Sequence, residues 1–440
     1  MKQLLVVLTA LMFWGPPRLR VDQRPLGIAL ENPFDLDGSA FFQVAVWILS
    51  ALVVAFILGG RGLFGRHFLP KVVWRSSLRL YLAYGLLALA SATYSVSPFY
   101  TLFFAGKILT SLLAVALLTD RSDLSRPAPM VFTVYMAVSI VQWLLNASFL
   151  LIDPKLVGTE LPNIGYRLAG GIFEDYGTPT AMASLFFLSA ALFSSRQMVR
   201  IGSWGLFTLT WVFLGLSRTR SSIIGALAML LVMLTLHRRS YSRVVAFLII
   251  GLVCLGLIAT QMVDSLVVFG MRGQSFESLL TFTGRTQAFE FLVNQWKDSP
   301  WLGLGYGAGT RFLLIRFVRE TGLGIGSAHD AVSKVLVDLG LLGAVVLGLV
   351  FVLTWMEMIR LVRIVRPYPE LQPLAMQLFA VFVYYELTNV VAGGIAEVPG
   401  PLLVVSVCAA VVRRRIAIEV TGQRRVLRLE GLPLTPCPSN

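Results

Sequence analysis

The sequence holds three histidines, and His329 stands apart from the basic surroundings of His67 and His237. It lies in the run 327–330 (Ser-Ala-His-Asp), directly before an apolar segment. A neutral imidazole can accept a proton from a hydroxyl group near neutral pH, so His329 is a candidate general base. Asp330 is a candidate for orienting that imidazole. The alternative is structural, because a histidine in this place often caps a helix.

Several arginines stand where apolar or amphipathic segments begin. Arg218 and Arg220 open the apolar run 221–236, Arg167 precedes another apolar run, and Arg285 opens an amphipathic segment. The N-terminus of a helix exposes N–H groups and the positive end of the helix dipole, and an added cation strengthens its attraction for anions. If these helix starts converge, the site would suit a diphosphate. Any one of these arginines could instead anchor an ordinary loop.

The remaining reactive residues point to neither a cofactor nor a metal. Cys254 and Cys408 lie in apolar runs and Cys437 in the terminal tail, so they form neither a disulfide framework nor a Cys/His metal site. The glycine-rich segment 303–309 matches neither the dinucleotide fingerprint nor the P-loop spacing. We interpret it as a flexible turn.

Composition shows what kind of scaffold must position these groups. Of the 440 residues, 56% are apolar and 14% are charged, with a mean hydropathy of +0.77. These values predict an all-α integral membrane protein with about twelve transmembrane helices. The expected spans are 4–14 (short), 40–59, 80–96, 101–119, 129–152, 178–194, 203–216, 221–236, 244–262, 332–355, 373–392 and 398–412.

The net charge of +14 is explained by topology rather than by a nucleic-acid partner. When the loops are assigned alternately to two sides, most Lys and Arg residues fall on the side of both termini, and most acids fall on the other side. By the positive-inside rule, both termini are expected to be cytoplasmic. Two long external segments, 153–177 and 263–331, are therefore expected to hold the function.

The second external segment shows helical periodicity. Residues 285–298 predict an amphipathic helix stopped by Pro300, with the side chains of Phe289, Leu292, Val293 and Trp296 on its apolar face. Arg285 precedes Phe289 by four residues, which places its charge on that face. Residues 311–320 predict a second amphipathic helix, which would lie at the membrane surface.

Few charged residues lie inside the predicted spans. Lys334 and Asp338 are four residues apart on one helix face and can neutralise each other. Lys107 and Glu386 are the other embedded charges. The chain then divides into a helical bundle (1–262), a large external loop (263–331), three further spans (332–412) and a basic cytoplasmic tail (413–440).

Several short motifs together resemble the O-antigen ligase superfamily. Its C-terminal signature is similar to Thr283-Gly284-Arg285-Thr286, Asp298-Ser299-Pro300-Trp301-Leu302-Gly303-Leu304-Gly305, Ala328-His329-Asp330 and Val337-Asp338-Leu339-Gly340-Leu341-Leu342-Gly343. Its central Ser-Arg segment is similar to Leu216-Ser217-Arg218-Thr219-Arg220-Ser221. Twelve spans with a large external loop before the tenth are also the architecture of that family.

The resemblance implies a membrane glycosyltransferase. It would transfer a glycan from a polyprenyl (undecaprenyl) diphosphate carrier to the hydroxyl of a lipid core or glycan acceptor, with inversion and without a metal or cofactor. The family pattern implies that His329 activates the acceptor hydroxyl, while Arg218 and Arg285 hold the diphosphate. Arg220 and Asp330 are secondary candidates. The resemblance also implies the bacterial inner membrane, with the active site on the external (periplasmic) face, in contact with membrane lipids.

A further family segment resembles Arg167-Leu168-Ala169-Gly170-Gly171-Ile172-Phe173. Here Glu174-Asp175-Tyr176-Gly177 stands where Asn-Pro-Asn is common. This departure makes Arg167 a secondary candidate for holding the diphosphate.

Alternatives remain open. The same architecture serves a polymerase that extends one lipid-linked glycan with another, or a transferase that modifies protein. Asp35-Leu36-Asp37 could be the acidic metal motif of another membrane glycosyltransferase class. A lipid-linked glycan flippase or other transporter could use the same cations to line a path.

Overall fold

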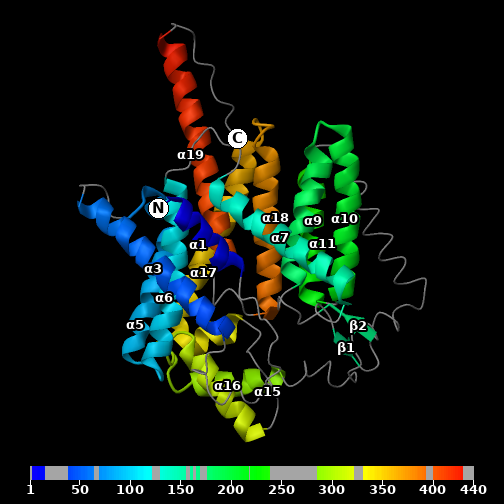
Figure 1. The fold of residues 1–440 in the computed structure, drawn as a ribbon. Helices are drawn as coiled ribbons and strands as arrows, with labels where there is room; N and C mark the ends of the chain where they lie inside the picture. Colours follow the sequence, from blue (N-terminus) through cyan, green and yellow to red (C-terminus); the bar gives the residue numbers. More distant parts are fainter. Residues whose placement is uncertain are drawn as a thin grey trace.

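A computed structural model of the chain describes residues 2–14, 38–63, 69–120, 129–154, 159–161, 165–168, 176–217, 219–237, 285–321, 331–392 and 400–429. These residues are helical except for one short hairpin and the connecting turns (Figure 1). The helices are α1 (Lys2–Trp14), α3 (Gly38–Leu63), α4 (Lys71–Trp74), α5 (Leu78–Ala90), η1 (Ser91–Thr93), α6 (Pro98–Asp120), α7 (Met130–Ile152), α9 (Gly177–Phe193), α10 (Gln197–Ser217), α11 (Arg220–Leu236), α15 (Arg285–Trp296), α16 (Ala308–Thr321), α17 (Ala331–Val365), α18 (Gln372–Ala392) and α19 (Gly400–Leu429). The strands are β1 (Thr159–Leu161) and β2 (Gly165–Arg167).

Every predicted span except 244–262 coincides with a helix, and that one lies outside the described residues. Two helices continue beyond the predicted spans. α17 reaches Val365 instead of 355, and α19 runs through most of the predicted basic tail to Leu429. Arginine is a good helix former, so these helices do not end where their apolar runs end.

The described helices have the length and composition of membrane spans. Within the described residues, five helices are long and apolar enough to cross a bilayer, namely α3, α6, α7, α10 and α17. Their outward faces expose large apolar side chains such as Phe56, Val212 and Val352, which water would disfavour and lipid would cover. The chain is therefore a helical membrane protein. The full number of crossings stays a prediction.

The segment 153–177, predicted to be external, departs from the all-α expectation. β1 and β2 pair antiparallel, with Thr159 opposite Arg167. The backbone N–H of Leu168, directly after β2, donates to the carbonyl of Leu216 near the end of α10 at 3.0 Å. The hairpin is thus joined to the bundle at the point where α10 ends.

The two ends of the helix bundle differ in what they carry. The hairpin and the loop helices α15 and α16 lie at one end, at the bottom of Figure 1. The C-terminal half of α19 projects from the other end. Between them, buried side chains of α5, α6, α11, α17, α18 and α19 form one continuous apolar core that holds the helix starts in place.

Candidate functional site at the loop end of the bundle

The starts of α9 and α11 lie against each other. A side chain at Gly177, the first residue of α9, would overlap the side chain of Ser222 in the first turn of α11. The Tyr384 hydroxyl of α18 lies 3.1 Å from Thr178 Oγ1 and 3.2 Å from Ser222 Oγ, within hydrogen-bonding distance of both helices. The positive ends of two helix dipoles therefore converge at one place.

The hairpin brings a predicted arginine position to the same place. Because Leu168 bonds to Leu216, the end of β2 lies beside the end of α10, only two residues before position 218. Leu168 is buried with Tyr176 and Phe213, which seals this junction. Residue 167 is thus near the α10–α11 connection, although the side chain of Arg167 lies outside the described residues.

The α10–α11 connection is short. Ser217 ends α10, Thr219 precedes α11, and the N–H of Thr219 bonds to Ser217 Oγ at 3.3 Å. Arg218 lies between them, outside the described residues, and Arg220 is the first residue of α11, with a side chain that is also outside them. The backbone therefore places position 220 at the start of α11, and position 218 is the one residue between Ser217 and Thr219.

A second pair of helices carries the other predicted site positions. α15 packs on the first part of α17, with Ala288 and Leu292 buried against Val337. Arg285 is the first residue of α15, and its side chain lies outside the described residues. His329 and Asp330 immediately precede α17 and also lie outside them. The fold thus joins the helix of Arg285 to the helix that follows His329.

The predicted apolar face of α15 is partly wrong. Ala288 and Leu292 are buried, whereas the side chain of Phe289 is 45% exposed. The reason is that α15 packs against α16 and α17 along a narrow stripe, which leaves Phe289 outside it. At 100° per residue, position 285 falls between the directions of Leu292, which is buried, and Trp296, which packs against the same cluster, so it lies on the packed face, next to the exposed Phe289. The end of α15 at Trp296, shortly before Pro300, agrees with the prediction.

The segment Gly303–Gly309, called the glycine turn below, forms a turn whose backbone lies close to α17. It wraps around the carboxylate of Asp338, whose side chain is only 1% exposed. Asp338 Oδ2 accepts a hydrogen bond from the N–H of Gly307 at 2.9 Å. Asp338 Oδ1 accepts from the N–H of Thr310 at 2.7 Å and from its hydroxyl at 2.8 Å. Asp338 also interacts electrostatically with Lys334, so the predicted mutual neutralisation describes only part of its environment.

The glycine turn docks where α17 is broken. Gly340 has φ 64° and ψ −163°, a conformation essentially restricted to glycine, and this interrupts the helix. The break separates Leu341 and Leu342 from the carbonyls four residues earlier, those of Val337 and Asp338. An apolar interior cannot leave these groups unpaired without a large cost.

All four separated groups find partners in residues 300–305. The carbonyls of Val337 and Asp338 accept from Leu304 N at 2.8 Å and Gly305 N at 3.0 Å, respectively. The N–H groups of Leu341 and Leu342 donate to Pro300 O at 2.8 Å and Trp301 O at 3.3 Å, respectively. Residues 300–305 and the break in α17 at Gly340 therefore form one backbone junction.

Close backbone approach explains the glycines at this junction. A Cβ atom at Gly303 would come within 2.6 Å of the Asp338 carbonyl carbon. A Cβ atom at Gly340 would overlap the Trp301 carbonyl. Gly303 also has φ 70°, which disfavours other residues.

Residues of α5, of η1 and of the turn before α6 contact the glycine turn from another side. The N–H of Val96 donates to Leu304 O at 3.1 Å, and the N–H of Tyr306 donates to Ser91 Oγ at 3.0 Å. The Tyr306 ring meets the ring of Tyr84 edge-on, with centroids 6.1 Å apart. Burial raises the pKa of the Tyr306 hydroxyl well above its usual range, and the nearby Tyr84 and Asp338 add to this effect, so the phenol stays neutral.

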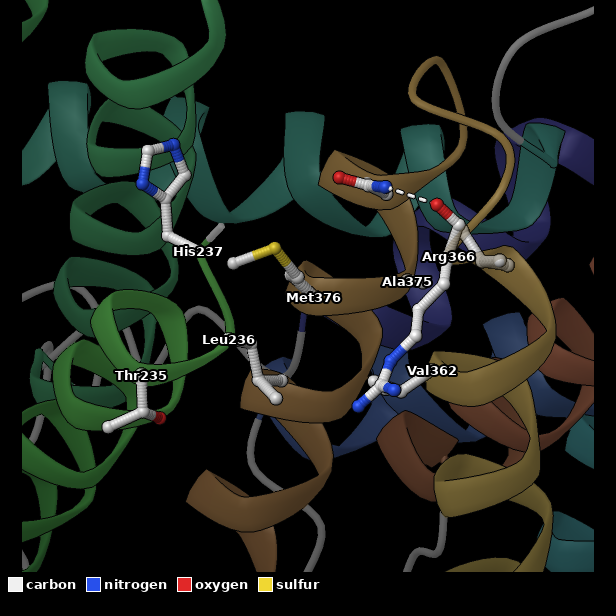
Figure 2. A pocket seen from close by; sticks show the side chains of 9 residues that line it. Thr235, Leu236, His237, Val362, Arg366, Ala375 and Met376 are labelled. Atoms are coloured by element: carbon white, nitrogen blue, oxygen red, sulfur yellow. Dashed lines mark hydrogen bonds between the residues drawn. The ribbon is translucent and has the colours of Figure 1, made fainter. Parts of the chain in front are cut away.

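A cavity of about 430 Å³ lies at the opposite end of the bundle (Figure 2). It is formed where α11 and α17 end and α18 begins, and there Gln372 Nε2 donates to the Arg366 carbonyl at 2.8 Å. Its lining residues are Thr235, Leu236, His237, Val362, Val365, Arg366, Gln372, Ala375 and Met376. Because this cavity is far from the converging helix starts, we do not assign the predicted substrates to it.

A comparison with protein families matches the same region. Residues 205–348 match the family model described as O-antigen ligase, which covers about a third of the chain. The matched stretch contains the α10–α11 connection, α15, the glycine turn and the break in α17; of the predicted site residues, only Arg167 lies outside it. The predicted resemblance to the O-antigen ligase superfamily is thereby confirmed. A comparison with curated proteins gives no match.

Proposed function

We propose that this chain, whose residues 205–348 match the O-antigen ligase family, is a membrane glycosyltransferase that uses a polyprenyl-diphosphate-linked glycan as donor. The main observation behind this proposal is that the matched stretch includes the start of α11, which contacts the start of α9. Two helix N-termini and nearby arginine positions form a strongly anion-attracting region, suited to the diphosphate of such a donor.

The reaction is one displacement at the anomeric carbon. The acceptor oxygen forms the new glycosidic bond, the bond from the anomeric carbon to the phosphate oxygen breaks, and the configuration inverts. His329 accepts the proton of the acceptor hydroxyl. Arg218 and Arg285 stabilise the charge that grows on the departing lipid diphosphate, within a site shielded from water. The step needs neither a metal nor a cofactor.

The secondary candidates have supporting roles. Arg167 adds positive charge beside Arg218, and the bond from Leu168 to Leu216 supports this placement. Arg220, as the first residue of α11, adds charge at the same helix start. Asp330 orients the imidazole of His329, as the next residue in the chain.

The site faces the external side of the bacterial inner membrane. The end of the bundle that carries the hairpin, α15 and α16 is opposite the end from which the arginine-containing part of α19 projects (Figure 1). Since basic segments stay in the cytoplasm, this arrangement supports cytoplasmic termini and a periplasmic active site.

The embedded charges favour an enzyme over a flippase. The Lys107 ammonium lies 5.2, 5.7 and 5.0 Å from the ring centroids of Trp47, Phe103 and Phe104, respectively. Asp338 is held by the glycine turn. Both of these charged groups are engaged by contacts within the protein, as expected for structural charges rather than for the lining of a path. Asp35 and Asp37 lie outside the described residues, so the acidic-motif alternative depends on a test of metal dependence.

A reconstitution assay tests the function. Purified protein is mixed with a lipid-linked glycan and, in separate reactions, with a lipid core, a second lipid-linked glycan or a peptide acceptor. We expect a new glycosidic bond with the lipid core, in the presence of EDTA, and no bond with His329→Ala. Product only with a second lipid-linked glycan would identify a polymerase. Movement of the glycan across the bilayer without any new bond would identify a flippase and refute the proposal.

A further inference from the structure

We propose that Asp338 is a positioning residue for glycan transfer, because its carboxylate holds the glycine turn that connects the helix of Arg285 to the helix start next to His329. This inference rests on the proposed function. Asp338 does not touch substrate in this proposal; it acts through the groups that it aligns.

Hydrogen bonds link each part of the chain between the end of α15 and the glycine turn. Trp296 Nε1 donates to the carbonyl of Pro300 at 3.1 Å, and the N–H of Ser299 donates to the carbonyl of Trp296 at 3.0 Å. Ser299 Oγ then donates to the carbonyl of Gly303 at 2.9 Å. A shift of the glycine turn would therefore move the end of α15 with it.

Hydrogen bonds also link the glycine turn to the first part of α17. Besides the backbone junction at Gly340, the Asp338 carboxylate accepts one hydrogen bond from Gly307 in the turn and two from Thr310, directly after it. Asp338 lies before the break, on the part of α17 that starts two residues after His329. The carboxylate thus joins a segment leading to Arg285 and a segment leading to His329.

A carboxylate suits this place because the three groups that hydrogen-bond to its two oxygens all act as donors. Two are the backbone N–H groups of Gly307 and Thr310, and the third is the Thr310 hydroxyl. An ionised carboxylate accepts at both oxygens, whereas an asparagine amide would turn one NH₂ group toward an N–H donor. Asp338→Asn should therefore loosen the glycine turn without changing the size of the side chain.

Loss of alignment should affect the chemical step more than binding. The donor diphosphate can be held by long arginine side chains that follow small movements. Attack at the anomeric carbon requires the base and the leaving group to keep a defined geometry, and a misplacement of about 1 Å can lower a rate by about 10²-fold. We expect Asp338→Asn to lower kcat by roughly this factor while the donor Kd changes little.

Glu357 provides a matched control. It is a second buried carboxylate on α17, and it also accepts a backbone N–H bond and a hydroxyl bond, both from Ser77. It joins α17 to the start of α5 and makes none of the contacts with the glycine turn. Glu357→Gln should cost stability, as Asp338→Asn does, but it should leave kcat per folded molecule close to native.

Thr310 offers a graded test of the same contact. Thr310→Ser keeps both the hydroxyl and the N–H that reach Asp338, so kcat should stay near the native value. Thr310→Val removes only the hydroxyl bond, so the loss in kcat should be smaller than that of Asp338→Asn. Equal kcat values for the serine and valine variants would contradict a role for this contact in alignment.

A double-variant experiment separates positioning from simple destabilisation. In a His329→Ala background there is no base to align, so adding Asp338→Asn should reduce the residual rate far less than about 10²-fold. A structural defect would lower the rate by the same factor in both backgrounds. An equal factor in both backgrounds would overturn the proposal.

A distance measurement tests the arrangement independently of catalysis. Spin labels at Gln287→Cys on α15 and Val345→Cys on α17, with the native cysteines replaced, should give a narrow distance distribution that Asp338→Asn broadens and Glu357→Gln does not. An unchanged distribution in Asp338→Asn would overturn this inference while leaving the proposed glycosyltransferase intact. Absence of any new glycosidic bond with the native protein and every acceptor in the reconstitution assay would instead refute the proposed function, whatever the distances show.

Discussion

The carbonyl of Val337 accepts its hydrogen bond from the N–H of Leu304 at 2.8 Å, rather than from Leu341, its regular partner on α17. This exchange makes residues 300–305 a structural part of the helix. It also turns two motifs that are far apart in the sequence into one unit on the helix that begins two residues after the proposed catalytic histidine. The stability of this unit should depend on its glycines.

Gly340→Ala should strongly destabilise the protein. The positive φ costs about 1–3 kcal/mol for a residue with a side chain, and the added Cβ would also overlap the Trp301 carbonyl. Thermal unfolding in detergent should show a large drop in Tm. Gly348→Ala is the control on the same helix, because no atom lies within 4 Å of its Cβ position. It should leave Tm unchanged or raise it slightly, and equal Tm losses would contradict the role of the break.

Gly177→Ala should separate the starts of α9 and α11 and reduce transfer. The new Cβ would overlap the side chain of Ser222, so one helix must move away. Ser222→Gly added to Gly177→Ala should restore part of the activity by removing that side chain. Gly215→Ala is the control, since no atom lies within 4 Å of its Cβ position on α10. Initial rates at saturating donor would measure each effect; native rates in Gly177→Ala would argue against convergence as a requirement.

Arg218→Lys and Arg285→Lys should each impair transfer while the protein remains inserted and folded. Lysine keeps the positive charge but loses the planar pair of donors that can hold two phosphate oxygens at once. Donor binding and turnover should be measured separately for each variant. Full activity in both variants would remove the diphosphate clamp from the mechanism. A mild loss in one would assign that arginine to background electrostatics.

His329→Ala should lower turnover by roughly 10² to 10⁴-fold, as expected for loss of a general base, while donor binding persists. If the imidazole works in its neutral form, the native rate should fall as the pH drops through its pKa, ordinarily about 6.5. The residual activity of the alanine variant should lack this acid limb. If the rate of the alanine variant still falls at low pH, another group is responsible for the pH dependence.

The proposed topology predicts which introduced cysteines an impermeant reagent can reach from outside intact cells. Glu160→Cys and Ser275→Cys should react, whereas Ser240→Cys and Glu370→Cys should react only after the membrane is opened. The native cysteines must first be replaced. The reverse labelling pattern would place the proposed site in the cytoplasm and exclude a periplasmic acceptor.

Elements that depend on local sequence were predicted well. Apolar runs located the helices, and the periodicity of residues 285–298 together with Pro300 located α15 and its end. The basic parts of α17 and α19 were missed as helices because the prediction followed hydropathy, whereas the helices continue into arginine-containing segments.

Contacts between distant segments could not be predicted in the same way. The run Leu339-Gly340-Leu341 resembles any apolar helix, because the groups that satisfy its break lie about 40 residues earlier. The glycines at 303, 305 and 307 indicated a turn, but the bond from Leu304 to Val337 and the bonds from Gly305 and Gly307 to Asp338 depend on tertiary structure. A useful signal was available, since an aspartate inside an apolar run must find donors, and a glycine-rich segment presents many accessible N–H groups.

The break in α17 also has a consequence for biosynthesis. Hydrocarbon offers no water to a separated N–H or carbonyl group, and each unpaired group costs several kcal/mol there. Residues 300–305 leave the ribosome before Gly340, so the segment that pairs with the break is already made when α17 enters the membrane. Insertion of α17 and docking of the preceding loop should therefore occur as one coupled event, and a chain that stalls between them would expose an incomplete helix to the quality-control proteases of the membrane.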